Sequence, residues 1–284
     1  MNFIYSLQDV KISLERINEI HQSRNEESKN NQMKEFAGEK AIRINEISFR
    51  YDPHSLKKTL DNITFEIPEG KVTAIVGASG SGKTTLIKLM LGYYPVSEGA
   101  IMVSGKNINE YNLKWWRRCF GVVMQDGVIF SESIARNIAV GDSEVDIARL
   151  EQAARIACIH DYILSLPLKY NTKIGRDGVG LSQGQKQRIL IARAVYKNPV
   201  FIFLDEATNS LDAKNEREIV ENLDDFYKGR TVVVVAHRLS TVKNADQIVV
   251  IDSGKVVEKG THTELIEKQG GYFNLVKNQL ELGN

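Results

Sequence analysis

The residues most able to do chemistry lie in a glycine-rich stretch, GASGSGKTT, at positions 77–85. Its first eight residues fit the pattern G-x-x-x-x-G-K-S/T, in which glycines let backbone N–H groups surround phosphates and a helix start adds partial positive charge. Lys83 is expected to contact the β- and γ-phosphates of a nucleotide, and Thr84 to bind Mg²⁺ through its hydroxyl. The predicted nucleotide site comprises Gly77, Ala78, Ser79, Gly80, Ser81, Gly82, Lys83, Thr84 and Thr85.

A pair of acids follows the apolar run FIFL at residues 201–204. Ligands of open α/β sheets bind at the carboxyl ends of the strands, so Asp205 and Glu206 are expected near the glycine loop. Asp205 can hold Mg²⁺ through water, and Glu206 can act as the general base toward an attacking water. One acid would suffice for binding, so two in tandem favour hydrolysis.

Three further side chains could complete this site. His237 ends another buried run, residues 232–235, and is expected beside the γ-phosphate. Gln125 follows a short apolar run, so its amide could reach Mg²⁺ and the attacking water. Tyr51 could stack on adenine. None of these residue types is diagnostic alone, and a lone histidine is more often structural.

A second polar turn opens a helix at residues 181–188, LSQGQKQR. The Ser182 hydroxyl and the free N–H groups of a helix start are features of an anion site. About a hundred residues and a helical block separate it from the glycine loop, so we expect it on a separate lobe. A head-to-tail pair of chains with twofold symmetry would bring each turn to the other chain's γ-phosphate, with ATP between the copies.

The composition is that of a globular protein large enough to bury a core, with 284 residues of which 42% are apolar and 26% charged. Lys and Arg number 37 against 36 for Asp and Glu, which disfavours a nucleic-acid partner. Cys119 and Cys158 have no ligand-like spacing, which favours a reducing compartment. No apolar run approaches the roughly 20 residues that cross a bilayer, and no signal peptide is expected at the start.

The candidate site residues must be positioned by strands and helices. Short runs rich in Ile, Val, Phe and Thr predict strands at residues 41–51, 59–67 and 71–77. The continuous apolar runs before Glu206 and His237 predict strands buried on both faces of a parallel sheet. A turn at Ser253 and Gly254 predicts a hairpin. Helical spacing covers residues 144–166, with one face formed by Ile147, Leu150, Ala154 and Ala157.

The first 40 residues have a different pattern. Apolar spacing predicts a helix over residues 1–22, and the polar stretch 23–40 predicts a linker. The linker leaves this helix without an obvious packing partner in the same domain. We therefore interpret it as the end of a helix from a preceding domain rather than as a helix packed on its own domain. Residues 41–284 then form the main domain, with a helical subdomain at about 126–195. The apolar stripe comprises Phe3, Leu7, Val10, Leu14 and Ile17.

Taken in order, these residues resemble the nucleotide-binding domain of ABC transporters over about Ala41 to Leu282. Single motifs of the set are weak, but the ordered set is highly specific. Residues 77–84 resemble the Walker A loop, and Tyr51 and Gln125 the adenine-stacking loop and the Q-loop. Further along, Leu181, Ser182, Gln183, Gly184 and Gln185 resemble the signature motif, Asp205 and Glu206 Walker B with its catalytic glutamate, Asn209 to Asp212 the D-loop, and His237 the switch histidine.

The resemblance implies an α/β fold with a RecA-like P-loop NTPase core, an antiparallel β subdomain and an α-helical signature subdomain. It implies ATP and Mg²⁺ sandwiched in a homodimer, with trans contacts from the signature and Asp212. Residues 1–22 then look like the end of a fused transmembrane domain, placing the protein at the cytoplasmic face of the inner membrane. The run 188–216 resembles bacterial peptide or bacteriocin exporters, including those with a peptidase domain.

This chain departs from the family pattern at two places. The usual signature has glycine where Gln183 stands, so a donor could come from a side chain. Exporters tend to have a glutamate followed by arginine where Arg176 and Asp177 stand, so the contact that couples this loop to membrane helices does not carry over simply.

Other functions remain open at this point. A lipid or drug exporter would use the same domain. A soluble ABC ATPase acting on DNA or ribosomes would be expected to carry coiled-coil insertions, zinc-binding cysteines or tandem cassettes, none of which this sequence has. The amphipathic lead-in argues against an importer's separate subunit, and a small-molecule kinase would have no use for the signature and D-loop.

Overall fold

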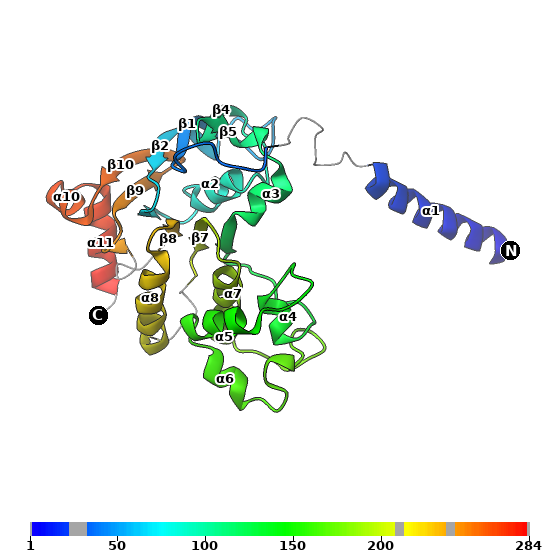
Figure 1. The fold of residues 1–284 in the computed structure, drawn as a ribbon. Helices are drawn as coiled ribbons and strands as arrows, with labels where there is room; N and C mark the ends of the chain where they lie inside the picture. The colour runs from blue at the N-terminus through cyan, green and yellow to red at the C-terminus, as the bar shows by residue number, and fades with distance from the viewer. Residues whose placement is uncertain (1, 23–32, 208–212, 237–241, 283–284) are drawn as a thin grey trace.

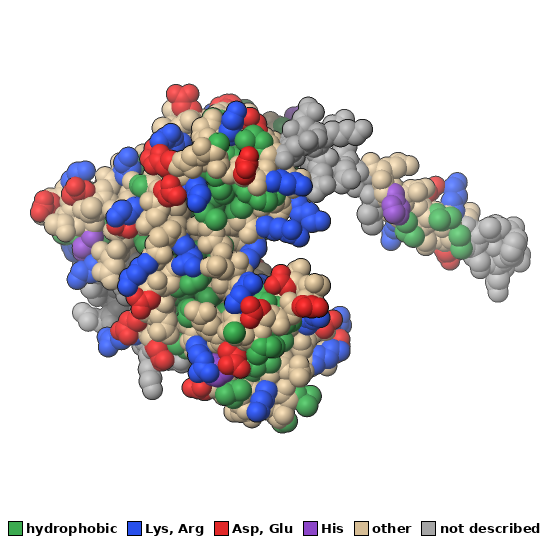
Figure 2. Space-filling model, viewed as in Figure 1, with side chains coloured by type: hydrophobic (Ala, Val, Ile, Leu, Met, Phe, Trp, Pro, Cys, Tyr) green, Lys and Arg blue, Asp and Glu red, His purple; other side chains and the backbone are tan. Residues whose placement is uncertain are grey.

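The computed structural model describes residues 2–22, 33–207, 213–236 and 242–282. Helix α1 (Asn2–Gln22) stands apart from the rest of the chain, which divides into a part built on two sheets and a part built on short helices (Figure 1). Acidic and basic side chains are interspersed over the face shown in Figure 2, which is indented between the two parts.

The larger sheet has six strands in the order β10-β9-β3-β8-β7-β6. Five of them are parallel: β3 (Val72–Val76), β6 (Phe120–Val123), β7 (Phe201–Asp205), β8 (Thr231–Val235) and β9 (Gln247–Asp252). This confirms the parallel pairing predicted for the strands now labelled β7 and β8. In the register, Val235 pairs with both Ile75 and Asp205, so the strand before the glycine loop and the strand before Glu206 end at the same edge. Strand β10 (Lys255–Gly260) adds antiparallel to β9, which confirms the predicted hairpin.

Both faces of the five parallel strands are buried because alternate residues of each strand enter different cores. Phe203 and Val233 face a core shared with α2 (Lys83–Met90) and α3 (Leu113–Arg118). Leu204 and Val234 face a core shared with the short helices and α8 (Ala213–Tyr227). This double burial explains why the runs in the sequence are continuous rather than alternating.

The second sheet covers one side of α2. Its four antiparallel strands, in the order β2-β1-β4-β5, are β1 (Ile42–Phe49), β2 (Leu60–Ile67), β4 (Glu98–Val103) and β5 (Lys106–Asn107). Ile44, Ile63 and Ile101 from this sheet share their core with Leu86 and Met90 of α2. The helix that follows the glycine loop is thereby held between the two sheets.

The helical part contains α4 (Ile134–Ile138), α5 (Ile147–Ile156), α6 (His160–Ser165) and α7 (Gln183–Tyr196). The helical stretch expected at residues 144–166 is two helices, because the chain turns at Cys158, whose φ of 50° is left-handed. Ile147, expected on the buried face, is 61% exposed, whereas Leu150, Ala154 and Ala157 are buried as expected. The chain ends with α10 (His262–Glu267) and α11 (Gly271–Leu282).

The N-terminal region differs in part from the prediction. Val10, Leu14 and Ile17 of α1 are all about half exposed, and no helix among the described residues is long and apolar enough to cross a membrane. Residues 33–40, however, are more than a polar linker. The Phe36 ring packs at a tilt against Trp115, with 4.9 Å between ring centroids, and edge-on against Phe201, with 5.7 Å between centroids. The expected linker therefore ends nearer residue 33 than residue 40.

Candidate nucleotide-binding site

The glycine loop joins β3 to α2, and its backbone requires glycine at two positions. Gly82 has a φ of 106° and a Cβ there would lie 2.5 Å from the Leu60 side chain. A Cβ on Gly77 would collide with the backbone oxygen of Ile251 in β9. A side chain at either position would push the loop off the sheet edge. The close path of the loop along the sheet therefore requires glycine at both positions.

The first turn of α2 is left open toward the loop. Its N-cap, Gly82, has no side chain to cap the helix, so the leading N–H groups face the space that the loop encloses. Lys83 is only 5% exposed, and its ammonium donates to the carbonyl oxygens of Gly77 at 3.0 Å and Ala78 at 2.8 Å. Burial lowers the pKa of Lys83, while the negative charges of Glu206 and Asp205 oppose that shift.

The hairpin turn between β9 and β10 braces the loop. The Gly254 N–H donates to the Ser81 carbonyl at 3.1 Å, and the Gly254 carbonyl accepts from the Asp61 N–H at 2.8 Å. A Cβ on Gly254, whose φ is 78°, would lie 2.6 Å from the Thr59 oxygen. The turn itself was predicted from the sequence, but its contact with the glycine loop joins residues more than 170 positions apart and has no local signal.

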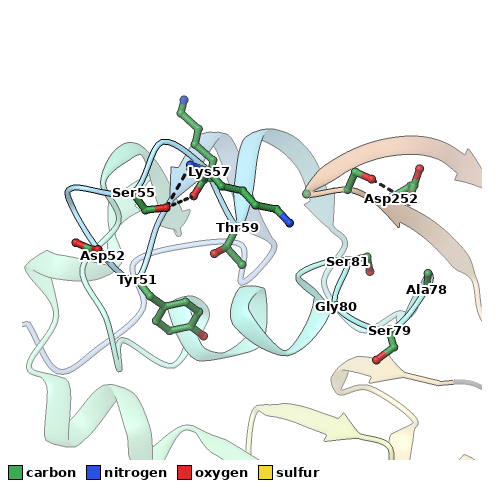
Figure 3. A pocket seen from close by; sticks show the side chains of 13 residues that line it. Tyr51, Asp52, Ser55, Lys57, Thr59, Ala78, Ser79, Gly80, Ser81 and Asp252 are labelled. Atoms are coloured by element: carbon green, nitrogen blue, oxygen red, sulfur yellow. Dashed lines mark hydrogen bonds between the residues drawn. The ribbon is translucent and has the colours of Figure 1, made fainter.

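A cavity of about 600 Å³ adjoins the loop (Figure 3). Figure 3 shows Tyr51 on one side of it and residues 78–81 on the other. The Tyr51 ring is half exposed, packs edge-on against Phe49 and Tyr94, and shares a 3.1 Å hydrogen bond through its hydroxyl with Thr85 Oγ1. Sequence reasoning missed the other lining residues, among them Asp52, Ser55, Lys57, Lys58, Thr59, Asp252 and Ser253.

A second cavity, of about 230 Å³, brings the candidate catalytic residues together. Lys83, Thr84, Gln125 and Glu206 all line it. Asp205 ends β7 beside them and is fully buried. The structure therefore places the residues expected to bind phosphate, to hold Mg²⁺ and to activate water around one space.

Glu206 has a conformation that no sequence pattern signals. Its φ is 54°, in the left-handed region that a glutamate rarely adopts. Its backbone N–H donates to the Val235 carbonyl at 3.0 Å, which ties the turn after β7 to the end of β8. Backbone outliers of this kind cluster at functional sites because surrounding contacts hold them. Asn209, Asp212 and His237 lie outside the described residues.

The turn before α7 is more self-contained than expected. The Ser182 hydroxyl accepts from the Gln185 N–H at 3.2 Å, and the Gln185 side-chain oxygen accepts from the Ser182 N–H at 2.8 Å. This capping box uses two of the N–H groups that the sequence suggested were free, and the N–H groups of Gln183 and Gly184 remain at the helix start. None of residues 181–185 lines either cavity, so the turn does not reach the loop of its own chain.

Comparison with known proteins places this geometry in a family. The family model described as "ABC transporter" matches residues 60–209. The leukotoxin translocation ATP-binding proteins of Mannheimia haemolytica and Bibersteinia trehalosi are each 42% identical over 276 residues, which is 97% of this chain but 38% of theirs.

A solved structure gives the same placement. A bacterial Atm1-family ABC exporter with ATP bound has a TM-score of 0.89 and 32% identity, and the match covers 98% of this chain and 49% of that one. This chain thus spans less than half the length of these relatives. With its RecA-like α/β core, glycine loop and signature turn, the chain belongs to the ABC transporter family.

Proposed function

We propose that this chain is the ATP-binding and ATP-hydrolysing domain of an exporter. The observation that carries the proposal is the shared lining of one cavity by Lys83, Thr84, Gln125 and Glu206. Lys83 meets the β- and γ-phosphates, the N–H groups of the glycine loop and of the open α2 terminus surround them, and Tyr51 stacks on adenine across the adjoining cavity. His237, which follows β8 by two residues in the sequence, completes the γ-phosphate environment in this proposal.

Glu206 acts as the general base in this proposal. Glu206 follows β7 and lines the same cavity as Gln125, and in this proposal the two side chains hold one water between them and the γ-phosphate. Lys83 stabilises charge on the phosphates, and it does so from a buried site where water screens it little.

The donors present suit magnesium. The Thr84 hydroxyl, the Gln125 amide oxygen and the Asp205 carboxylate are hard oxygen ligands, and Mg²⁺ usually keeps several waters and binds substrate phosphates rather than an all-protein cage. Among the described residues no group of three His, Cys, Asp or Glu side chains is placed to hold a metal. When bound, Mg²⁺ neutralises charge on the β- and γ-phosphates.

The signature turn serves a second copy of the chain. Residues 181–185 line neither cavity of their own chain. In the proposed twofold homodimer the Ser182 hydroxyl and the N–H groups of Gln183 and Gly184 bind an ATP held by the partner, together with Asp212. The half-exposed side chains of Val10, Leu14 and Ile17 in α1 fit the end of a fused membrane domain at the cytoplasmic face of the inner membrane.

Export of a peptide is the favoured outcome of the cycle. The supports are the similarity of residues 188–216 to peptide exporters and the relatives named for leukotoxin translocation. Stimulation of the full-length protein's ATPase by peptides, with no response to lipids or drugs, would support this cargo, and the reverse pattern would point to the alternative.

The hydrolytic core of the proposal is tested by Glu206→Gln. The variant keeps the size and polarity of the side chain but removes the base, so ATP binding measured by calorimetry should persist while turnover falls by about 10² to 10⁴. Normal turnover in the variant would show that Glu206 is not the base, and an absence of ATP binding in the unmodified chain would remove the function itself.

A further inference from the structure

The segment after Gln125 is attached to the signature helix rather than to the sheet it leaves. Gly127 lies so close to α7 that a Cβ there would collide with the Leu190 side chain. The guanidinium of Arg193, also on α7, donates through Nη1 to the Val128 carbonyl at 3.0 Å and lies over the Phe130 ring, 5.3 Å from its centroid. Residues 127–130 therefore follow α7 if that helix moves.

Asn137 of α4 completes the attachment. It is fully buried, its Oδ1 accepts from the Phe130 N–H at 2.8 Å, and its Nδ2 donates to the Phe130 carbonyl at 2.9 Å. Arg193 donates two hydrogen bonds to Asn137, from Nε to the backbone carbonyl at 2.7 Å and from Nη2 to Oδ1 at 3.3 Å. An asparagine is suited to this place because it supplies an acceptor and a donor at once.

The position of Arg193 likewise requires a guanidinium group. All three of its nitrogens are engaged, by two backbone carbonyls and one amide oxygen, in a planar fork that a lysine cannot reproduce. Burial lowers the pKa of Arg193, yet an arginine remains charged in proteins at any working pH. The cation is therefore kept where a neutral side chain would pack more easily, which indicates that its hydrogen bonds matter.

The attachment joins the two halves of the proposed site. Gln125, two residues before Gly127, lines the cavity with Thr84 and Glu206. Gln183, the first residue of α7 and the neighbour of Ser182, lies ten residues before Arg193 on the same helix, about 15 Å away at 1.5 Å per residue. We infer that Asn137 and Arg193 are positioning residues that fix Gln125 in the phosphate cavity relative to the signature turn.

This inference rests on the proposed hydrolysis and predicts a specific pattern in the full chain. Arg193→Met should lower kcat for ATP hydrolysis at least about tenfold, since misplacement by an ångström can cost up to 10²-fold, while the Kd for ATP stays within about twofold. The kcat of Arg193→Lys should lie between those of Arg193→Met and the unmodified chain. Amide hydrogen exchange over residues 126–132 should become faster in Arg193→Met.

The matched control is Arg149→Met. Arg149 also donates to a backbone carbonyl, that of Tyr196 at 2.6 Å, and lies over the Tyr196 ring, but it does not contact residues 126–132. It should lose a similar amount of thermal stability with kcat unchanged. An equal loss of kcat in both variants, or no loss in Arg193→Met, would overturn the inference while leaving the ATPase assignment intact, whereas an inactive unmodified chain would remove the proposed function first.

Discussion

The helices α2 and α7 both begin with a small polar turn, but the two turns satisfy their backbone groups in opposite ways. At α2 the N-cap is Gly82, which has no side chain to cap the helix, and the turn contains the buried Lys83. At α7 the N-cap is Ser182, which forms a reciprocal capping box with Gln185. The N–H groups at the start of α2 are left for solvent or a ligand, whereas the start of α7 is partly satisfied by its own side chains.

The difference also lies in what surrounds each turn. The glycine loop is enclosed by the Ser253 and Gly254 turn on one side and by β2 on the other, so its shape is set before any ligand binds. Residues Ser182 and Gln183 are exposed and line neither cavity. A preformed, enclosed turn can bind phosphate by itself, whereas an exposed, self-capped turn can only add to a site completed by another surface.

The largest effect that tests this contrast is on nucleotide affinity. Lys83→Met should raise the Kd for ATP roughly 10- to 100-fold, because hydrogen bonds to charged groups contribute about 1.5–3 kcal/mol. Lys186→Met, in the first turn of α7, makes the same substitution at an exposed lysine and should change the Kd by less than about twofold. Equal effects by calorimetry would show that the two turns are not distinguished as we describe.

The next largest effect is expected at the Ser253 and Gly254 turn that contacts the glycine loop. Gly254→Ala forces a Cβ toward the Thr59 oxygen at a left-handed φ, so we expect a loss of about 1–3 kcal/mol and weaker ATP binding. For a chain of this size each kcal/mol lowers the Tm by about 2–4 °C. Gly180→Ala, two residues before Ser182, places its Cβ in open space and should leave Tm and affinity unchanged. A Gly254→Ala variant that binds ATP normally would contradict the brace.

A smaller effect is expected at the capped turn. Ser182→Ala removes the hydroxyl that accepts from the Gln185 N–H and should cost about 1 kcal/mol of stability. Ser133→Ala removes the equivalent cap of α4 and should cost a similar amount. If the turn serves the partner's ATP, only Ser182→Ala will also slow hydrolysis at saturating ATP, and loss of turnover in both variants would mean that the effect is on folding.

Local patterns predicted the elements that hold the site, and long-range contacts could not be predicted. The strands β7 and β8 were recognisable because burial on both sheet faces leaves a continuous apolar run. The docking of Phe36 on Trp115 was missed because one aromatic residue in a polar stretch has no periodicity. The break at Cys158 was missed because a single left-handed residue interrupts a helix without changing its composition.

The smallest effect is expected where the sequence departs from the family, at Gln183. Gly77, Gly80 and Gly82 all have positive φ, which only glycine adopts easily, so those positions cannot accept glutamine. Gln183 is the first residue of α7, has no positive φ, and is exposed, so its backbone does not need glycine.

Gln183→Gly should therefore change the stability by less than about 0.5 kcal/mol and leave the Kd for ATP unaltered. A turnover within about threefold of the unmodified chain would show that backbone N–H groups carry the signature's contribution, since effects of this size correspond to less than about 0.7 kcal/mol. A larger fall would instead show that the Gln183 amide itself supplies a donor to the partner's nucleotide.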